Sequence, residues 1–95
     1  MKLFGILFPS FRKGTSVIVA SPTCARGERA ELLFEFLDPS NKYRRNLYGA
    51  IKRNTKGHIV SLMKYKDPEG DSYIYYGVLI KEVLYAIEEE RLARA

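Results

Sequence analysis

Several residue types that define common protein classes are scarce or missing in this chain. It has no tryptophan. It has a single cysteine, Cys24, so no disulfide can form within the chain, and the fold does not depend on an oxidising compartment. No apolar run is long enough to span a bilayer, and the apolar start is too short and too soon interrupted for a secretion signal. We therefore expect a soluble cytoplasmic protein without a signal peptide or a membrane partner.

Residues that could catalyse a reaction or hold a metal are also few. The single histidine, His58, is distant in sequence from Cys24, and neither residue lies in a recognisable catalytic motif. These two side chains cannot complete a zinc site without two further ligands, and the carboxylates show no ligand spacing. The glycines are isolated and form no phosphate-binding loop. The sequence predicts no metal, no cofactor and no catalytic residue.

Acidic residues are missing from one long central segment. Residues 39–66 contain eight Lys or Arg and no Asp or Glu. The whole chain carries a net charge of +5, so the remainder of the chain carries −3. The basic residues of the segment are Lys42, Arg44, Arg45, Lys52, Arg53, Lys56, Lys64 and Lys66. Concentrated positive charge attracts polyanions, and DNA or RNA is therefore the predicted partner.

The first half of the chain predicts two strands and a helix within a single domain over residues 1–95. Leu3–Phe8 and Ser16–Ala20 are short apolar runs separated by a turn-rich connector, which is typical of strands. Between Glu28 and Asp38, apolar residues recur at helical spacing with glutamates on the other side. The helical stripe consists of Ala30, Leu33, Phe34 and Leu37.

The second half predicts two more helices on either side of a hairpin. Residues 41–56 have helical spacing and end at Gly57, a residue that commonly terminates helices. Residues 58–66 and 72–80 are rich in Ile, Val and Tyr around a strong turn signal. Residues 81–94 again show a helical apolar stripe. The predicted fold is α+β, in the order strand, strand, helix, helix, hairpin, helix.

Two helices followed by a hairpin have the sequence order of a winged helix-turn-helix. The second helix would lie in the major groove, so duplex DNA is slightly favoured over RNA, and the function predicted is non-catalytic nucleic-acid binding. The predicted contact residues are Lys42, Arg45, Gly49, Lys52, Arg53, Lys56, Lys64 and Lys66. The hairpin tyrosines would either stack on unpaired bases of a single strand or pack in the core.

Three alternatives remain open from the sequence. The basic face could dock on a protein, either as an interaction module or as an inhibitor of a larger nucleic-acid enzyme. The acidic run Glu88–Glu90 could instead contact the basic segment of a second copy and form a homodimer. A metal-independent endoribonuclease would use side chains such as His58, Tyr65, Lys64 and Arg53 to cleave RNA.

Overall fold

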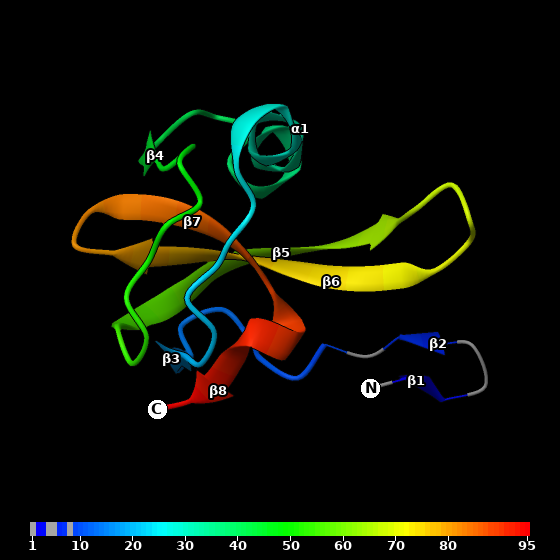
Figure 1. Ribbon diagram of the computed structural model, residues 1–95, viewed down its shortest axis with the longest axis horizontal. Coiled ribbons are helices and arrows are strands. Elements are labelled where there is room, and N and C mark those ends of the chain that lie inside the picture. Colours follow the sequence, from blue (N-terminus) through cyan, green and yellow to red (C-terminus); the bar gives the residue numbers. More distant parts are fainter. Residues whose placement is uncertain (1, 4–5, 8) are drawn as a thin grey trace.

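A six-stranded mixed sheet dominates the computed structural model, which describes residues 2–3, 6–7 and 9–95, with side chains from residue 9 onward (Figure 1). Its strands are β3 (Ser16–Val19), β4 (Arg44–Arg45), β5 (Lys56–Lys66), β6 (Ser72–Ile80), β7 (Val83–Glu88) and β8 (Leu92–Arg94). One α-helix, α1 (Gly27–Leu37), and a short 3-10 helix, η1 (Glu89–Arg91), accompany this sheet in the described part of the chain. The predicted three-helix α+β order with a winged helix-turn-helix is therefore wrong.

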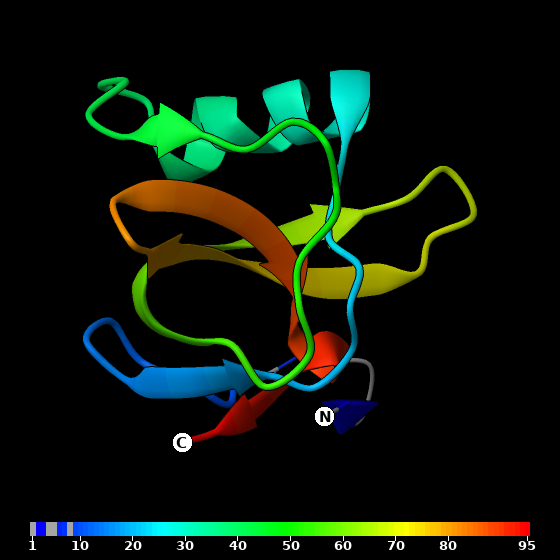
Figure 2. The ribbon, with the colours of Figure 1, turned by 60° about the vertical axis from the view of Figure 1, so that its left-hand side comes forward.

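The order of the strands requires the sheet to curl. The strands follow the order β4-β7-β6-β5-β3-β8, and β4 pairs parallel with β7 while the other pairs are antiparallel. Only η1 separates β7 from β8 along the chain, yet three strands lie between them in the sheet. Figure 2 shows β5 bending so that β3 and β8 lie beneath β6 and β7. A register shift between Ile59 and Ser61 contributes to this bend, since bulges increase strand curvature.

Each face of the curled sheet buries its own apolar cluster. The inner cluster is formed by Phe11, Val17, Val19, Ile59, Ile74, Tyr76, Val78, Ile80, Ile87 and Leu92. The outer cluster lies under α1 and contains Ala30, Leu33, Phe34, Leu37, Tyr75, Leu84 and Ala86. Successive side chains of a strand point to opposite faces, so β6 and β7 contribute to both clusters. This alternation also decides which tyrosines of β6 lie on the α1 side.

The structure confirms several of the predicted elements. α1 spans the segment between Glu28 and Asp38 that was predicted as a helix, and the predicted stripe of four apolar residues is its buried face. β3 matches the second predicted strand, and β5 with β6 forms the predicted hairpin. The first predicted strand, Leu3–Phe8, lies partly outside the described residues. Its described residues, with Lys2, form two short antiparallel strands, β1 (Lys2–Leu3) and β2 (Ile6–Leu7), where one strand was predicted.

Residues 41–56, predicted as the basic helix, follow an irregular path that includes the two-residue strand β4. At the start of this segment the buried Asp38 carboxylate accepts hydrogen bonds from two backbone N–H groups, which holds the chain out of a helix. Gly49 and Asn54 have φ values of +80° and +67°, in the left-handed region that a right-handed helix excludes. The local spacing was helical, but side-chain capture of the backbone and positive φ values determine the conformation.

Residues 81–94, the predicted last helix, form β7, η1 and β8 instead. Lys81 and Glu82 have φ values of +48° and +68°, as the central residues of a two-residue type I′ hairpin require. Val83 to Ile87 then pair with β6, and burial alternates from Val83 to Ala86, as in a strand. Short apolar runs fit both periods, and here the tight turn between β6 and β7 selected the strand.

Tyr76 connects the inner cluster to η1 and to the connector before β3. Its side chain is fully buried, and its hydroxyl donates to Glu89 Oε2 (2.6 Å) and accepts from the Phe11 N–H (3.1 Å). Glu89 also accepts hydrogen bonds from the Ser10 N–H (2.9 Å) and hydroxyl (3.0 Å). Burial alone would raise the pKa of Glu89, but these hydrogen bonds together lower it. Glu89 is thus part of the fold, and not of a solvated acidic helix.

Stability is expected to fall between about pH 10 and pH 12 because of Tyr76. Burial and the hydrogen bond to Glu89 raise the pKa of Tyr76 to about 12 from the ordinary tyrosine value of 10.0. In this pH window the folded chain keeps a proton that the unfolded chain releases, so the free energy of unfolding decreases as pH rises, by up to about 1.4 kcal/mol per pH unit from this group. Urea denaturation from pH 8 to 11 should show a steeper decline for the intact chain than for Tyr76→Phe. Equal slopes would contradict this role.

Candidate functional site

A groove of about 960 Å³ lies on the α1 side of the sheet, beyond the N-terminal end of the helix. It lies between the segment leading into α1, the open end of the β5–β6 hairpin and the end of β7 with η1. Its lining residues that carry charge or an aromatic ring are Arg26, Arg29, Tyr65, Asp67, Tyr73, Tyr75, Glu88 and Arg91. Arginine and tyrosine thus make up six of these eight side chains.

Three tyrosines form the sheet wall of the groove. Tyr65 pairs directly with Tyr73 across β5 and β6, and their rings stack with centroids 6.4 Å apart. Tyr75 lies two residues further along the same face and meets Tyr65 edge-on at 6.1 Å. Tyr75 is buried, whereas Tyr65 and Tyr73 are partly exposed. The wall therefore has an aromatic surface that solvent can reach.

The hydroxyl groups of Tyr73 and Tyr75 stay protonated at neutral pH. Burial raises the pKa of Tyr75, with the charge of Glu88 acting in the same direction and that of Arg29 against it. The pKa of Tyr73 is also raised, first by desolvation and then by the negative charge of Asp67, whose Oδ2 accepts its hydroxyl hydrogen bond (3.3 Å). Neutral phenols suit stacking against an uncharged ring and can also donate hydrogen bonds.

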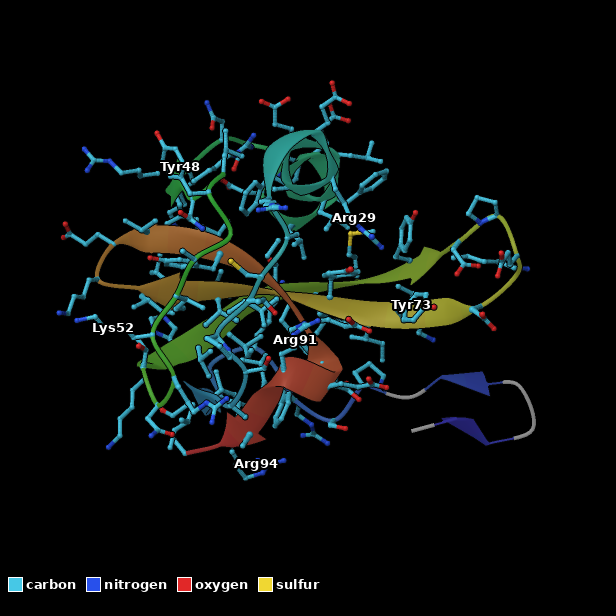
Figure 3. The ribbon with its side chains drawn as sticks, viewed as in Figure 1. Arg29, Tyr48, Lys52, Tyr73, Arg91 and Arg94 are labelled. Atoms are coloured by element: carbon cyan, nitrogen blue, oxygen red, sulfur yellow. The ribbon has the colours of Figure 1, made fainter. Side chains whose placement is uncertain are left out.

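Three arginines from different elements line the groove together with the tyrosines. The Arg29 guanidinium lies over the rings of Tyr65 (5.2 Å) and Tyr75 (5.8 Å), within the range of cation–π attraction. Arg91 on η1 donates from Nη1 to the Ser21 hydroxyl (2.8 Å). Figure 3 shows Arg29, Tyr73 and Arg91 approaching the groove from α1, β6 and η1. Arg26 directly precedes the helix and is exposed. The groove can thus offer several donors to an anion beside the rings.

The N-terminus of α1 adds backbone donors to this end of the groove. No side chain caps the helix, although the Gly27 N–H donates to the Leu47 carbonyl. Free N–H groups in a first helical turn carry partial positive charge and favour anions. The negative charge of Glu28 in that turn offsets part of this positive charge, so Arg26 and Arg29 supply the stronger attraction for an anion.

The two remaining reactive residues of the chain do not form a catalytic pair. Cys24 lines the groove, where the Asn46 amide donates to its sulfur (3.6 Å), and burial raises the pKa of the thiol and so disfavours the thiolate. His58 is exposed near the start of β5, six to seven residues from Lys64 and Tyr65, which corresponds to about 20 Å along a strand. The side chains considered for RNA cleavage are therefore not brought together.

No protein-family model, curated protein or solved structure matches this chain. Among the described side chains, no group of three or more His, Cys, Asp or Glu is arranged to hold a metal ion. In the same part of the chain, no helix has the length and apolar character needed to cross a bilayer. The function must therefore be argued from the groove itself.

The predicted contact residues are spread over several regions. Arg45 is committed to the fold: its Nη2 donates to the Asp38 carbonyl (2.6 Å) and its Nε lies 3.6 Å from the Asp38 carboxylate. Lys52, Arg53 and Lys56 are exposed around the turn that leads into β5, and Lys42 is exposed beside the ring of Tyr43. Within the described side chains, Gly49 is the one predicted contact residue that lines the groove.

Lys64 and Lys66 lie on the hairpin as predicted, but strand alternation places them on the face opposite Tyr65. The cations and aromatic rings of the hairpin therefore do not form one surface. Arg29 and Arg91, which share the groove with the tyrosines, were missed because each follows or precedes glutamates and neither belongs to the acid-free segment. The usable signal was the hairpin tyrosines, for which stacking on unpaired bases was one of two predicted roles.

Proposed function

We propose that the protein binds single-stranded nucleic acid in this groove, in the cytoplasm and without catalysis. The observation that carries the proposal is that three arginines and three neighbouring tyrosines line one groove, with the Arg29 guanidinium within cation–π range of two of the rings. Unpaired bases stack on aromatic side chains, and arginines contact the phosphates between them. Docking of a duplex by a basic helix, as predicted from the sequence, has no support because residues 41–56 form no helix.

The number of arginines sets the expected salt dependence. When a protein binds single-stranded nucleic acid, the logarithm of the affinity falls as the logarithm of the salt concentration rises. The slope is about −0.7 for each phosphate that the protein neutralises. Three arginines therefore predict a slope of about −2. The measurement is fluorescence anisotropy with labelled single-stranded RNA, single-stranded DNA and duplex DNA at several salt concentrations. Tighter binding of either single strand than of the duplex supports the proposal, and the two single-strand arms show which sugar is preferred.

Arg29→Ala is expected to weaken single-strand binding about tenfold, because it removes a charged donor and its stacking contact from the groove. It should also reduce the salt slope by about 0.7. Arg53→Ala is the matched control, since it removes the same charge from an exposed turn outside the groove. Equal losses in the two variants would contradict the assignment of the groove. If no oligonucleotide binds, the exposed Leu32 and Phe36 of α1 become the surface to test for a protein partner.

A further inference from the structure

Glu88 is a carboxylate inside a groove that otherwise attracts anions. It is the last residue of β7 and pairs directly with Tyr75 of β6, so both side chains lie on the groove face of the sheet. Glu88 is partly buried and lines the groove together with Arg29 and Arg91. Within the described part of the chain it accepts no hydrogen bond and forms no ion pair. Its oxygens are therefore available to a ligand.

The second carboxylate of the groove, Asp67, differs because the hairpin turn uses both of its oxygens. Its Oδ1 accepts from the N–H groups of Glu69 (3.0 Å) and Asp71 (2.9 Å), and its Oδ2 accepts from the Tyr73 hydroxyl. Asp67 thus holds the turn and orients one of the rings. Glu88 has no comparable structural role. Its negative charge would also repel the phosphates of a bound nucleic acid and so weaken binding, unless the carboxylate contacts another part of the ligand.

A carboxylate in such a place is favourable only if the ligand presents hydrogen-bond donors to it. Among the bases, guanine has two neighbouring donors on its Watson–Crick edge, N1–H and the N2 amino group, which match the two oxygens of a carboxylate. Cytosine and adenine each offer one amino group beside an acceptor nitrogen. Uracil offers one N–H between two carbonyl groups, which a carboxylate repels. Charge-assisted bidentate pairs are also stronger than single neutral hydrogen bonds.

We propose that Glu88 makes the groove selective for guanine in a single strand. This inference rests on the proposed function and assigns a specificity to the same site. Stacking on the exposed tyrosine surface holds the base, and the Glu88 carboxylate accepts hydrogen bonds from its N1–H and N2 amino group. Arg29 and Arg91 contact the flanking phosphates, so the carboxylate reads the base and not the backbone.

The test compares uridine hexamers that carry one central guanosine, inosine, adenosine or cytidine, with the all-uridine hexamer as the reference. Anisotropy titrations should show the guanosine hexamer binding about tenfold more tightly than the adenosine hexamer, as one bidentate pair predicts. Inosine keeps N1–H but lacks the N2 amino group, and should lose most of this advantage. Binding of guanosine and adenosine hexamers with equal affinity would overturn the inference while leaving the proposed function in place.

The variant Glu88→Gln tests the residue itself. Glutamine has a similar shape but presents one acceptor and one donor group, so the preference for guanosine should disappear. The all-uridine hexamer should bind more tightly than to the intact chain, because the charge that repels the uracil carbonyl groups is gone. Glu90→Gln is the control, because this exposed glutamate does not line the groove. A guanosine preference that survives in Glu88→Gln would refute the role of Glu88. Failure of every hexamer to bind the intact chain would refute the proposed function as well.

Discussion

Asp38→Ala is expected to lower the free energy of unfolding by about 3 kcal/mol, because it leaves two backbone N–H groups without their buried acceptor and removes the carboxylate that faces Arg45. Asp38 is 4% exposed. Its oxygens accept the N–H groups of Lys42 (3.0 Å) and Tyr43 (3.1 Å), and the Arg45 guanidinium lies 3.6 Å away. These contacts start the path that leads to β4, so the substitution should also loosen the edge of the sheet.

Urea denaturation followed by circular dichroism would measure this loss. Asp38→Asn keeps an acceptor oxygen but removes the charge, and should lose less stability than the alanine variant. Glu35→Ala is a suitable control, since this exposed glutamate of α1 should change stability by less than about 0.5 kcal/mol. A change at Asp38 no larger than the change at Glu35 would show that the carboxylate does not organise residues 38–45.

Gly57→Ala is expected to cost about 3 kcal/mol for a different reason, the lack of space for a side chain in β5. A Cβ at this position would lie 2.6 Å from Ile80 Cγ1 and 2.8 Å from the Leu79 carbonyl oxygen. The carbonyl belongs to the paired strand β6 and cannot move without disturbing the ladder. Gly57, predicted as the end of a helix, is thus required by close packing between strands.

Gly77→Ala provides the comparison in the same sheet. The nearest atom to a Cβ there is Ser61 Oγ, which can rotate away, and the next is Leu84 Cδ1 at 3.3 Å. We expect a loss of about 1 kcal/mol, since only a flexible side chain must move. Thermal or urea unfolding of both variants would check the order of the two effects. A smaller loss at Gly57 than at Gly77 would contradict the packing argument.

Sequence patterns predicted the elements whose local and tertiary preferences agree. α1 has an apolar stripe at helical spacing, and that stripe is the surface it buries against the sheet. The hairpin combines β-branched and aromatic residues with a turn in which Asp67 accepts two backbone N–H groups. In both cases the residues near each other in sequence contain the information that fixes the structure.

The two incorrect helices failed for reasons that lie outside a local window. Residues 83–87 have an apolar pattern that suits a helix, but pairing with β6 after the Lys81-Glu82 turn makes them a strand. Residues 41–56 are held by Asp38, which lies before them, and by packing of Tyr43 and Leu47 against the outer cluster. Tertiary contacts override spacing in both segments.

The site was predictable in part. Its tyrosines belong to one hairpin and were recognised as a possible surface for unpaired bases. Its arginines come from α1 and η1, separated by about 60 residues in sequence, and only the curl of the sheet brings them to the same groove. Net charge pointed to residues 39–66, yet charge along a sequence does not show which side chains share a face.

The most direct test of groove binding is a ¹⁵N-¹H correlation NMR titration of the intact chain with a single-stranded RNA hexamer. The expected shifts concentrate on residues that line the groove: residues 23–26, Arg29, Tyr65, Tyr73, Tyr75, Glu88 and Arg91. The largest changes are expected for backbone amides next to the tyrosine rings, because bases stacked on these rings add ring currents that shift nearby signals. Shifts confined to Lys42, Lys52, Arg53, Lys56, Lys64 and Lys66, with none at residues that line the groove, would contradict the proposal and would place the binding surface on the acid-free segment.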